Sequence, residues 1–152
     1  MTEMLKLDGS VFTTGRAVFS DRDPTGLERT AKIFVTVEFP GVGQSLAQLD
    51  TGSPWSVLEY AVAELLGVID GDGEEINLRT NRGIVTGRLE RVQLVLVAED
   101  GPSLKLEATF LVSQNWTGKT FLGYSGLLDR IRIALDPSTN SFFFGAIDRS
   151  LP

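Results

Sequence analysis

The stretch Ala47-Gln48-Leu49-Asp50-Thr51-Gly52-Ser53 decides how this chain of 152 residues is interpreted. We expect residues 47–49 to end a strand, and a second apolar stretch, residues 55–58, follows Ser53. An acidic residue and a glycine between two apolar segments place Asp50 at the tip of a loop. Taken alone, Asp-Thr-Gly can also be no more than a turn between two strands. Whether this segment is a plain turn or part of a functional site therefore has to be judged from the rest of the sequence.

Short strands make up most of the rest of the chain. β-Branched and aromatic residues dominate residues 33–39, which end at the turn signal Pro40-Gly41, and residues 45–49 can return as the second arm of this hairpin. Further strands are predicted at residues 10–19, 91–97, 104–112, 130–135 and 142–144.

Two helical segments interrupt the strands. Residues 59–66 carry good helix formers, with Val62, Leu65 and Leu66 on one side and Gly67 in place to cap the C-terminal end. Residues 126–130 predict one short turn or helix.

Many short strands with one or two helices predict an all-β fold, built as a closed barrel or a sandwich. The length fits one domain. We divide the chain into an N-terminal extension, residues 1–30, with one strand and a loop at residues 21–26, and a main domain, residues 31–152.

The residue types that are missing restrict the possible chemistry. The chain has no His and no Cys, so it cannot build a Ser-His-Asp triad, a Cys-His pair or a zinc site of imidazole and thiolate ligands. An enzyme of this composition that uses no cofactor must rely on Asp, Glu, Lys, Ser, Thr or Tyr, which makes carboxylates the leading acid and base candidates. We expect neither a cofactor nor a metal, because Gly41-Val42-Gly43 and the acidic residues 70–75 lack the remainder of a dinucleotide loop and of a calcium loop.

Charge and hydropathy restrict the partners. The net charge of −6 argues against nucleic acid, whose binding requires positive charge to replace counterions. No apolar run approaches the length of a membrane span, and the N-terminal residues lack the basic start and apolar core of a signal peptide. We therefore expect a cytoplasmic protein that binds neither nucleic acid nor membrane.

With its apolar flanks, Asp50-Thr51-Gly52-Ser53 resembles the catalytic loop of the pepsin and retropepsin superfamily of aspartic proteases. The resemblance implies that Asp50 is catalytic and acts on a water molecule from the loop tip. It implies that the Thr51 hydroxyl bonds a partner backbone and holds two such loops together. Gly52 would let the backbone turn tightly and bring amides near the carboxylate. The Ser53 hydroxyl would donate to the Asp50 carboxylate and favour its charged form.

Downstream segments match the same superfamily in the same order. Phe121-Leu122-Gly123 resembles the two apolar residues and glycine that pass beside the catalytic loop. Residues 126–131 resemble the short helix that follows, and residues 133–135 and 142–144 resemble the closing strands. The resemblance spans residues 31–145 and favours a site over a plain turn.

Residues 78–85 lie where the family has its flap, a glycine-containing hairpin over the substrate. This implies a flap and substrate-binding role for Arg79, Thr80, Asn81, Arg82 and Gly83.

The sequence also departs from the family's pattern. Tyr124 and Ser125 follow Gly123 where the family usually has Arg and then Asp or Asn, so an ion pair that braces the catalytic region is missing or replaced. The flap has the single glycine Gly83, which implies a stiffer tip. Residues 1–30 have no counterpart in the smallest members of the family.

The number of Asp-Thr-Gly segments determines the mechanism that the resemblance implies. The segment occurs once, because Asp23-Pro24-Thr25-Gly26 is interrupted by proline and Asp136-Pro137-Ser138 is more simply a turn. Aspartic proteolysis needs two carboxylates that share one proton, one acting as base on a water and the other as acid on the scissile carbonyl. One Asp50 per chain therefore requires a twofold homodimer with the site on its axis, and the expected substrate is a peptide or protein.

Two other functions remain open. The chain can be a dimeric peptide-binding module of the same fold with a weak or inactive dyad, which the changed Tyr124-Ser125 segment favours. It can also be a small β-barrel binding protein unrelated to proteases.

Two further hypotheses concern the dimer and the flap. Three adjacent phenylalanines, residues 142–144, cannot all face one core, because side chains alternate along a strand. We expect a partner subunit to cover at least one of them. Arg79 and Arg82 either favour acidic substrates above the dyad or point to solvent and keep the flap soluble.

Overall fold

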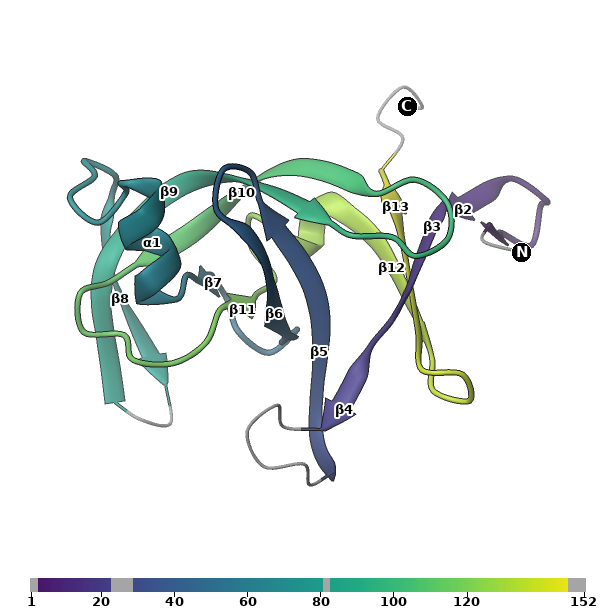
Figure 1. Cartoon of the computed structure of the whole chain (residues 1–152), viewed down its shortest axis with the longest axis horizontal. Coiled ribbons are helices and arrows are strands. Elements are labelled where there is room, and N and C mark those ends of the chain that lie inside the picture. Colours follow the sequence, from purple (N-terminus) through teal and green to yellow (C-terminus); the bar gives the residue numbers. More distant parts are fainter. Residues whose placement is uncertain (1–2, 23–28, 81–82, 148–152) are drawn as a thin grey trace.

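The computed structural model describes residues 3–22, 29–80 and 83–147 (Figure 1). Its strands before Asp50 are β1 (Met4–Leu5), β2 (Val11–Thr13), β3 (Gly15–Val18), β4 (Ser20–Arg22), β5 (Arg29–Phe39) and β6 (Gly43–Leu49). The elements that follow are β7 (Ser56–Val57), helix α1 (Tyr60–Leu66), β8 (Glu75–Thr80), β9 (Gly83–Leu96), β10 (Leu104–Val112) and β11 (Phe121–Leu122). The 3-10 helix η1 (Leu128–Arg130) and strands β12 (Ile131–Asp136) and β13 (Ser141–Ala146) complete the described elements.

The largest sheet closes on itself. Its eight strands lie in the order β4-β5-β6-β11-β7-β10-β9-β8. β5 also pairs with β9, at Val37↔Leu96 and Glu38↔Val95, so β5, β6, β11, β7, β10 and β9 form a ring. The predicted all-β fold with a closed barrel is confirmed.

The barrel core follows from alternation along its strands. Phe110 of β10 and Val37 and Phe39 of β5 are fully buried, and the rings of Phe39 and Phe110 meet edge to face with centroids 6.1 Å apart. Edge-to-face geometry suits the aromatic quadrupole. These strands show the period of two that a barrel with one apolar interior requires.

Most predicted elements appear with small changes in their bounds. β10 has the predicted limits, while the strand expected at residues 91–97 and the second arm of the flap form the single strand β9. Gly67 caps α1 as predicted, with φ of 73° and its amide donating to Ala63 and Glu64. The prediction for Leu65 was wrong: it is 71% exposed, because Val62, Ala63 and Leu66 form the inward face of this short helix.

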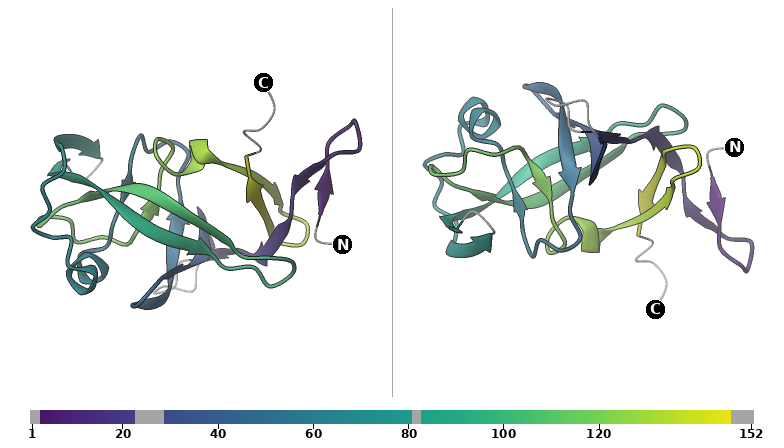
Figure 2. Two further views of the ribbon diagram at one scale, coloured as in Figure 1. Left: turned by 90° about the horizontal axis from the view of Figure 1, so that it is seen from above. Right: turned by 90° about the horizontal axis from the view of Figure 1, so that it is seen from below.

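A second sheet lies beside the barrel. It has the order β12-β13-β3, and both views of Figure 2 place it on the side of the molecule opposite α1. Phe142 and Phe144 are buried at 1% exposure, whereas Phe143 lies on the other face and is half-buried. The expected alternation of the three phenylalanines is confirmed.

A dimer contact at β13 stays a prediction, and the structure shows that the strand also has a role within its own chain. β13 pairs with β12 on one edge and with β3 on the other, so neither edge is free for a partner strand. Phe142 and Phe144 are covered by the core of their own chain. A truncation after Asn140 would therefore remove a central strand and damage the monomer itself.

Two N-terminal strands, β3 and β4, belong to these sheets, whereas β1 and β2 pair with each other in a separate two-stranded sheet. β3 pairs with β13, and β4 pairs with β5. Arg16 further ties β3 to the turn between β9 and β10, because its guanidinium lies 3.0 Å from the Asp100 carboxylate and its amide donates to the Asp100 carbonyl. Part of the loop expected at residues 21–26 is strand β4, and residues 23–26 lie outside the described residues.

In the part of the chain that the structure describes, no helix has the length and apolarity of a membrane span.

Replacing Phe142 with alanine tests the contribution of β13 to the monomer. We expect Phe142→Ala to lower the free energy of unfolding by about 3–5 kcal/mol, the usual loss for a fully buried phenylalanine. Phe143→Ala, on the half-buried face, is the matched control and should lose about 1–2 kcal/mol. Urea unfolding followed by circular dichroism measures both, and equal losses would contradict the assignment of faces.

Candidate active site

The loop that carries Asp50 joins β6 to β7, and β11 lies between these two strands. β11 runs parallel to β6, with Leu122 opposite Leu49, and antiparallel to β7, with Phe121 opposite Val57. The chain must therefore leave β6, pass the end of β11 and re-enter the sheet at β7. This path makes Asp50 the first residue of the loop, directly after Leu49, and not its tip as predicted, because Thr51 and Gly52 form the turn.

Backbone hydrogen bonds fix the start of the loop. The Asp50 amide donates to the Leu122 carbonyl at 3.0 Å, and the Ser53 amide donates to the Asp50 carbonyl at 3.2 Å. The Gly52 amide donates to Asp50 Oδ1 at 3.0 Å, which confirms the prediction that this glycine brings an amide to the carboxylate. Asp50 is half-buried, whereas Thr51 and Gly52 are exposed.

Ser53 has a different role from the one the sequence suggested. Its hydroxyl donates to the carbonyl of Trp55 at 2.7 Å. A hydroxyl has one proton to donate, so Ser53 does not donate to the Asp50 carboxylate in this structure. The prediction for the hydroxyl was wrong, because the tight turn from Ser53 to Trp55 brings a backbone acceptor closer.

Gly123 has a position that no larger residue can occupy. A Cβ at this position would lie 2.3 Å from the Trp55 carbonyl oxygen and 2.7 Å from the Ser56 nitrogen. The Gly123 amide donates to the buried hydroxyl of Ser56 at 2.9 Å. Phe121, Leu122 and Gly123 therefore pass beside the loop that carries Asp50, as predicted.

The segment after Gly123 braces the loop through its backbone. The Tyr124 amide donates to the Ser53 carbonyl at 2.8 Å, and the Ser125 amide donates to the Pro54 carbonyl at 2.9 Å. The sequence indicated that an ion pair was missing or replaced here. Two backbone hydrogen bonds hold the loop at this place.

Ser56 and Thr120 support the site and were not predicted. Both are fully buried. The Thr120 carbonyl accepts from Gln48 of β6, and its hydroxyl accepts from the Glu59 amide just before α1. A small hydroxyl residue inside an apolar strand, as at Ser56, is the one signal in the sequence that could have indicated such a role.

Strands β8 and β9 form the hairpin predicted as the flap. They pair antiparallel as far as Thr80↔Gly83, and the Thr80 hydroxyl donates to the Gly83 carbonyl at 2.8 Å. Asn81 and Arg82 lie outside the described residues. In Figure 1 the tip end of this hairpin and the end of β6 that leads to Asp50 point to the same side of the molecule.

The faces of the hairpin are clearly different. Leu78 and Val85 are buried and pack with Val57, Leu111 and Trp116 in a second, smaller core cluster. Arg79 and its cross-strand neighbour Ile84 are exposed, because they alternate with that buried pair. Arg79 therefore points away from the body of the domain.

The other aspartate considered in the sequence forms a turn. Asp136 Oδ1 accepts hydrogen bonds from the hydroxyl and the amide of Ser138, at 2.6 and 3.0 Å, and these bonds hold the pKa of Asp136 below its usual value. The turn connects β12 to β13, as the sequence indicated. Asp23 lies outside the described residues.

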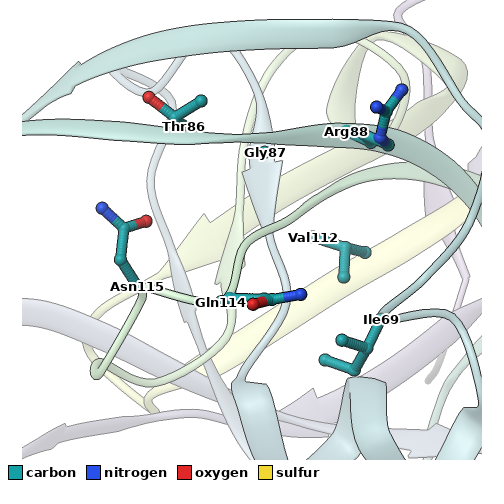
Figure 3. A pocket seen from close by; sticks show the side chains of 7 residues that line it. All are labelled: Ile69, Thr86, Gly87, Arg88, Val112, Gln114 and Asn115. Atoms are coloured by element: carbon teal, nitrogen blue, oxygen red, sulfur yellow. The ribbon is translucent and has the colours of Figure 1, made fainter.

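A pocket separate from these residues opens beside β9 (Figure 3). Its lining residues are Ile69, Thr86, Gly87, Arg88, Val112, Gln114 and Asn115. None of the predicted site residues is among them. Within the described ranges there is also no group of three acidic side chains placed to hold a metal ion.

Among solved structures, this chain is similar to the crystal structure of a retropepsin-like aspartic protease from Rickettsia conorii, with a TM-score of 0.55. The fold is retropepsin-like. The match covers 88% of this chain and 92% of that chain at 18% identity. No protein-family model matches the sequence, and the comparison with curated proteins also gives no match. At this identity the likeness concerns the fold alone.

The tight approach at Gly123 predicts different results for two glycines. We expect Gly123→Ala to lower the free energy of unfolding by about 1–3 kcal/mol, because backbone atoms of Trp55 and Ser56 must move to admit the methyl group. Gly52→Ala is the control within the same loop. Its Cβ would meet only Asp50 Oδ1, at 3.3 Å, so we expect a loss of about 0.5 kcal/mol or less. Thermal and urea unfolding measure both, and a stable Gly123→Ala variant would contradict the packing described here.

Proposed function

We propose that this chain is an aspartic endopeptidase that works as a homodimer. Asp50 and the same aspartate of a second copy would form the catalytic pair. The observation that supports this proposal best is the position of Asp50, at the start of a loop that backbone hydrogen bonds brace on both sides in a retropepsin-like fold.

The proposed chemistry uses one shared proton. The ionised carboxylate removes a proton from a water molecule, whose oxygen adds to the scissile carbonyl carbon, while the protonated carboxyl gives its proton to the carbonyl oxygen. The tetrahedral diol then collapses: one hydroxyl returns its proton to the ionised carboxylate as the C=O bond re-forms, the C–N bond breaks, and the leaving amine takes the proton of the other carboxyl. Every proton is accounted for by two carboxyl groups and one water, so the proposal requires no cofactor.

The substrate would be an extended peptide between the loop and the β8–β9 hairpin. The second core cluster fixes the middle of that hairpin through the cross-strand pair Leu78 and Val85. Trp55 and Phe121 are partly buried against the same cluster, so aromatic surface lies close to the loop. This arrangement supports peptide binding in a groove with an apolar wall.

A second function keeps the fold without the chemistry. The chain would be a dimeric peptide-binding module with an inactive pair of aspartates. Two observations favour it: Tyr124 and Ser125 stand where the family usually has Arg and then Asp or Asn, and the Ser53 hydroxyl donates to the Trp55 carbonyl instead of to Asp50.

Replacing one oxygen of the Asp50 carboxylate by an amide nitrogen distinguishes the endopeptidase from the binding module. We expect Asp50→Asn to lower the cleavage rate by at least about 100-fold, because the amide cannot accept the proton of the attacking water. Fold and dimer should remain, since the change removes charge and little volume. The test incubates each protein with a peptide library across pH 3–8 and identifies products by mass spectrometry.

Asp136→Asn is the matched control, and its cleavage rate should equal that of the parent. Equal cleavage by Asp50→Asn and the parent would place the chemistry elsewhere. A parent that binds library peptides and cleaves none would favour the binding module.

The flap provides a separate prediction about selectivity. Because Arg79 lies on the outer face of the hairpin, we expect Arg79→Gln to leave the cleaved sequences unchanged. Comparing the cleavage sites of the variant and the parent, at low and high salt, measures this. A loss of sites with acidic residues near the cut would show instead that the flap arginines select the substrate.

A further inference from the structure

An exposed, uncharged patch surrounds the proposed catalytic aspartate. Thr51, Gly52, Pro54 and Tyr124 are all exposed. The hydrogen bond from the Tyr124 amide to the Ser53 carbonyl joins the two segments of this patch at 2.8 Å. No charged residue occurs within residues 51–54 or 124–125.

Tyr124 is held rigidly by its backbone and is open at its side chain. Its amide donates to Ser53, and its carbonyl accepts from the Asp129 amide at 2.9 Å, so both backbone groups are fixed. The side chain is nevertheless 54% exposed. None of the described residues hydrogen-bonds the tyrosine hydroxyl. A fixed backbone with an exposed aromatic ring is typical of interface anchors, because little side-chain entropy is lost on binding.

We propose that Tyr124 is a contact residue of the homodimer and packs on the same patch of a second copy. The inference rests on the proposed function, which requires two Asp50 side chains close enough to share a proton. Because its amide is bonded to the Ser53 carbonyl, Tyr124 lies about one strand spacing, roughly 5 Å, from the 51–54 segment of its own chain. A twofold arrangement that brings the two loops together therefore brings each Tyr124 near the 51–54 segment of the partner.

Electrostatics favour this surface for a second copy. Each chain carries a net charge of −6, so two copies repel one another over most orientations. The uncharged patch is a place where they can approach without adding like charges beyond the aspartate pair. Tyr124 would then replace, by an aromatic contact, the charged residue that the family usually has at this position.

The experiment measures association without proteolysis. All proteins carry Asp50→Asn, which prevents self-cleavage, and sedimentation equilibrium gives the dissociation constant of the dimer. We expect Tyr124→Ser to raise this constant at least about tenfold, and Tyr124→Phe to keep it close to the parent value because the ring remains. Tyr60→Ser is the matched control, since Tyr60 is also exposed, at 38%, and lies on α1.

Three results of the sedimentation measurement would overturn the proposal. They are a parent that is monomeric at all concentrations, an equal dissociation constant for Tyr124→Ser and the parent, and equal weakening by Tyr60→Ser. If Tyr124→Ser raises KM in the protein that keeps Asp50 and leaves the dissociation constant of the dimer unchanged, the proposal is likewise overturned. Tyr124 would then be assigned to peptide binding. Sedimentation measures the mass of the complex and does not depend on cleavage. A dimer weakened by Tyr124→Ser therefore supports the contact even if the parent chain cleaves no peptide. The absence of cleavage would overturn only the proposed function.

Discussion

The two residues of β11 lie between β6 and β7 and complete the ring of the barrel. The hydrogen bond from the Asp50 amide to the Leu122 carbonyl joins segments that are distant in sequence. Because β6 and β7 are kept apart by a strand, the chain between them must cross the end of β11. The crossing leaves no space for a side chain at residue 123, and it brings the Asp50 carboxylate to the surface. The position of Asp50 and the requirement for Gly123 thus have the same cause.

The same strand also connects the loop to the hairpin above it. Phe121 packs edge to face on Trp116, with ring centroids 5.3 Å apart. Trp116 belongs to the small core cluster that holds Leu78 and Val85 of the hairpin. The indole nitrogen of Trp116 donates to the Lys119 carbonyl at 3.0 Å, which keeps its buried polar atom satisfied. A change at β11 should therefore disturb the loop and the middle of the hairpin together.

Local pattern in the sequence was enough to predict the elements near the site, and long-range pairing was not. The alternation of apolar and polar residues predicted the bounds of β10. The residue types from Asp50 to Gly52 predicted the loop, because an acidic residue and a glycine each favour a turn locally. Alternation also separated Phe143 from its neighbours, yet it carries no information on strand edges. The pairing of β13 with β3, which occupies the second edge, joins the two ends of the chain and had no local signal. The Ser53 hydroxyl was misassigned because two acceptors lay within reach and only the turn geometry decides between them.

At Tyr124 and Ser125 this chain differs from the residues that the family usually has. The hydrogen bonds that brace the loop show whether this difference argues against catalysis. An ion pair depends on the identity of two side chains, so its loss would matter if it alone held the loop. Here the amides of residues 124 and 125 donate to the carbonyls of residues 53 and 54, and backbone groups are present whatever the side chains are. The position of Asp50 is therefore independent of the missing charges. Replacing those charges leaves the loop in place and frees residue 124 for another contact, so the departures are compatible with a working pair of aspartates.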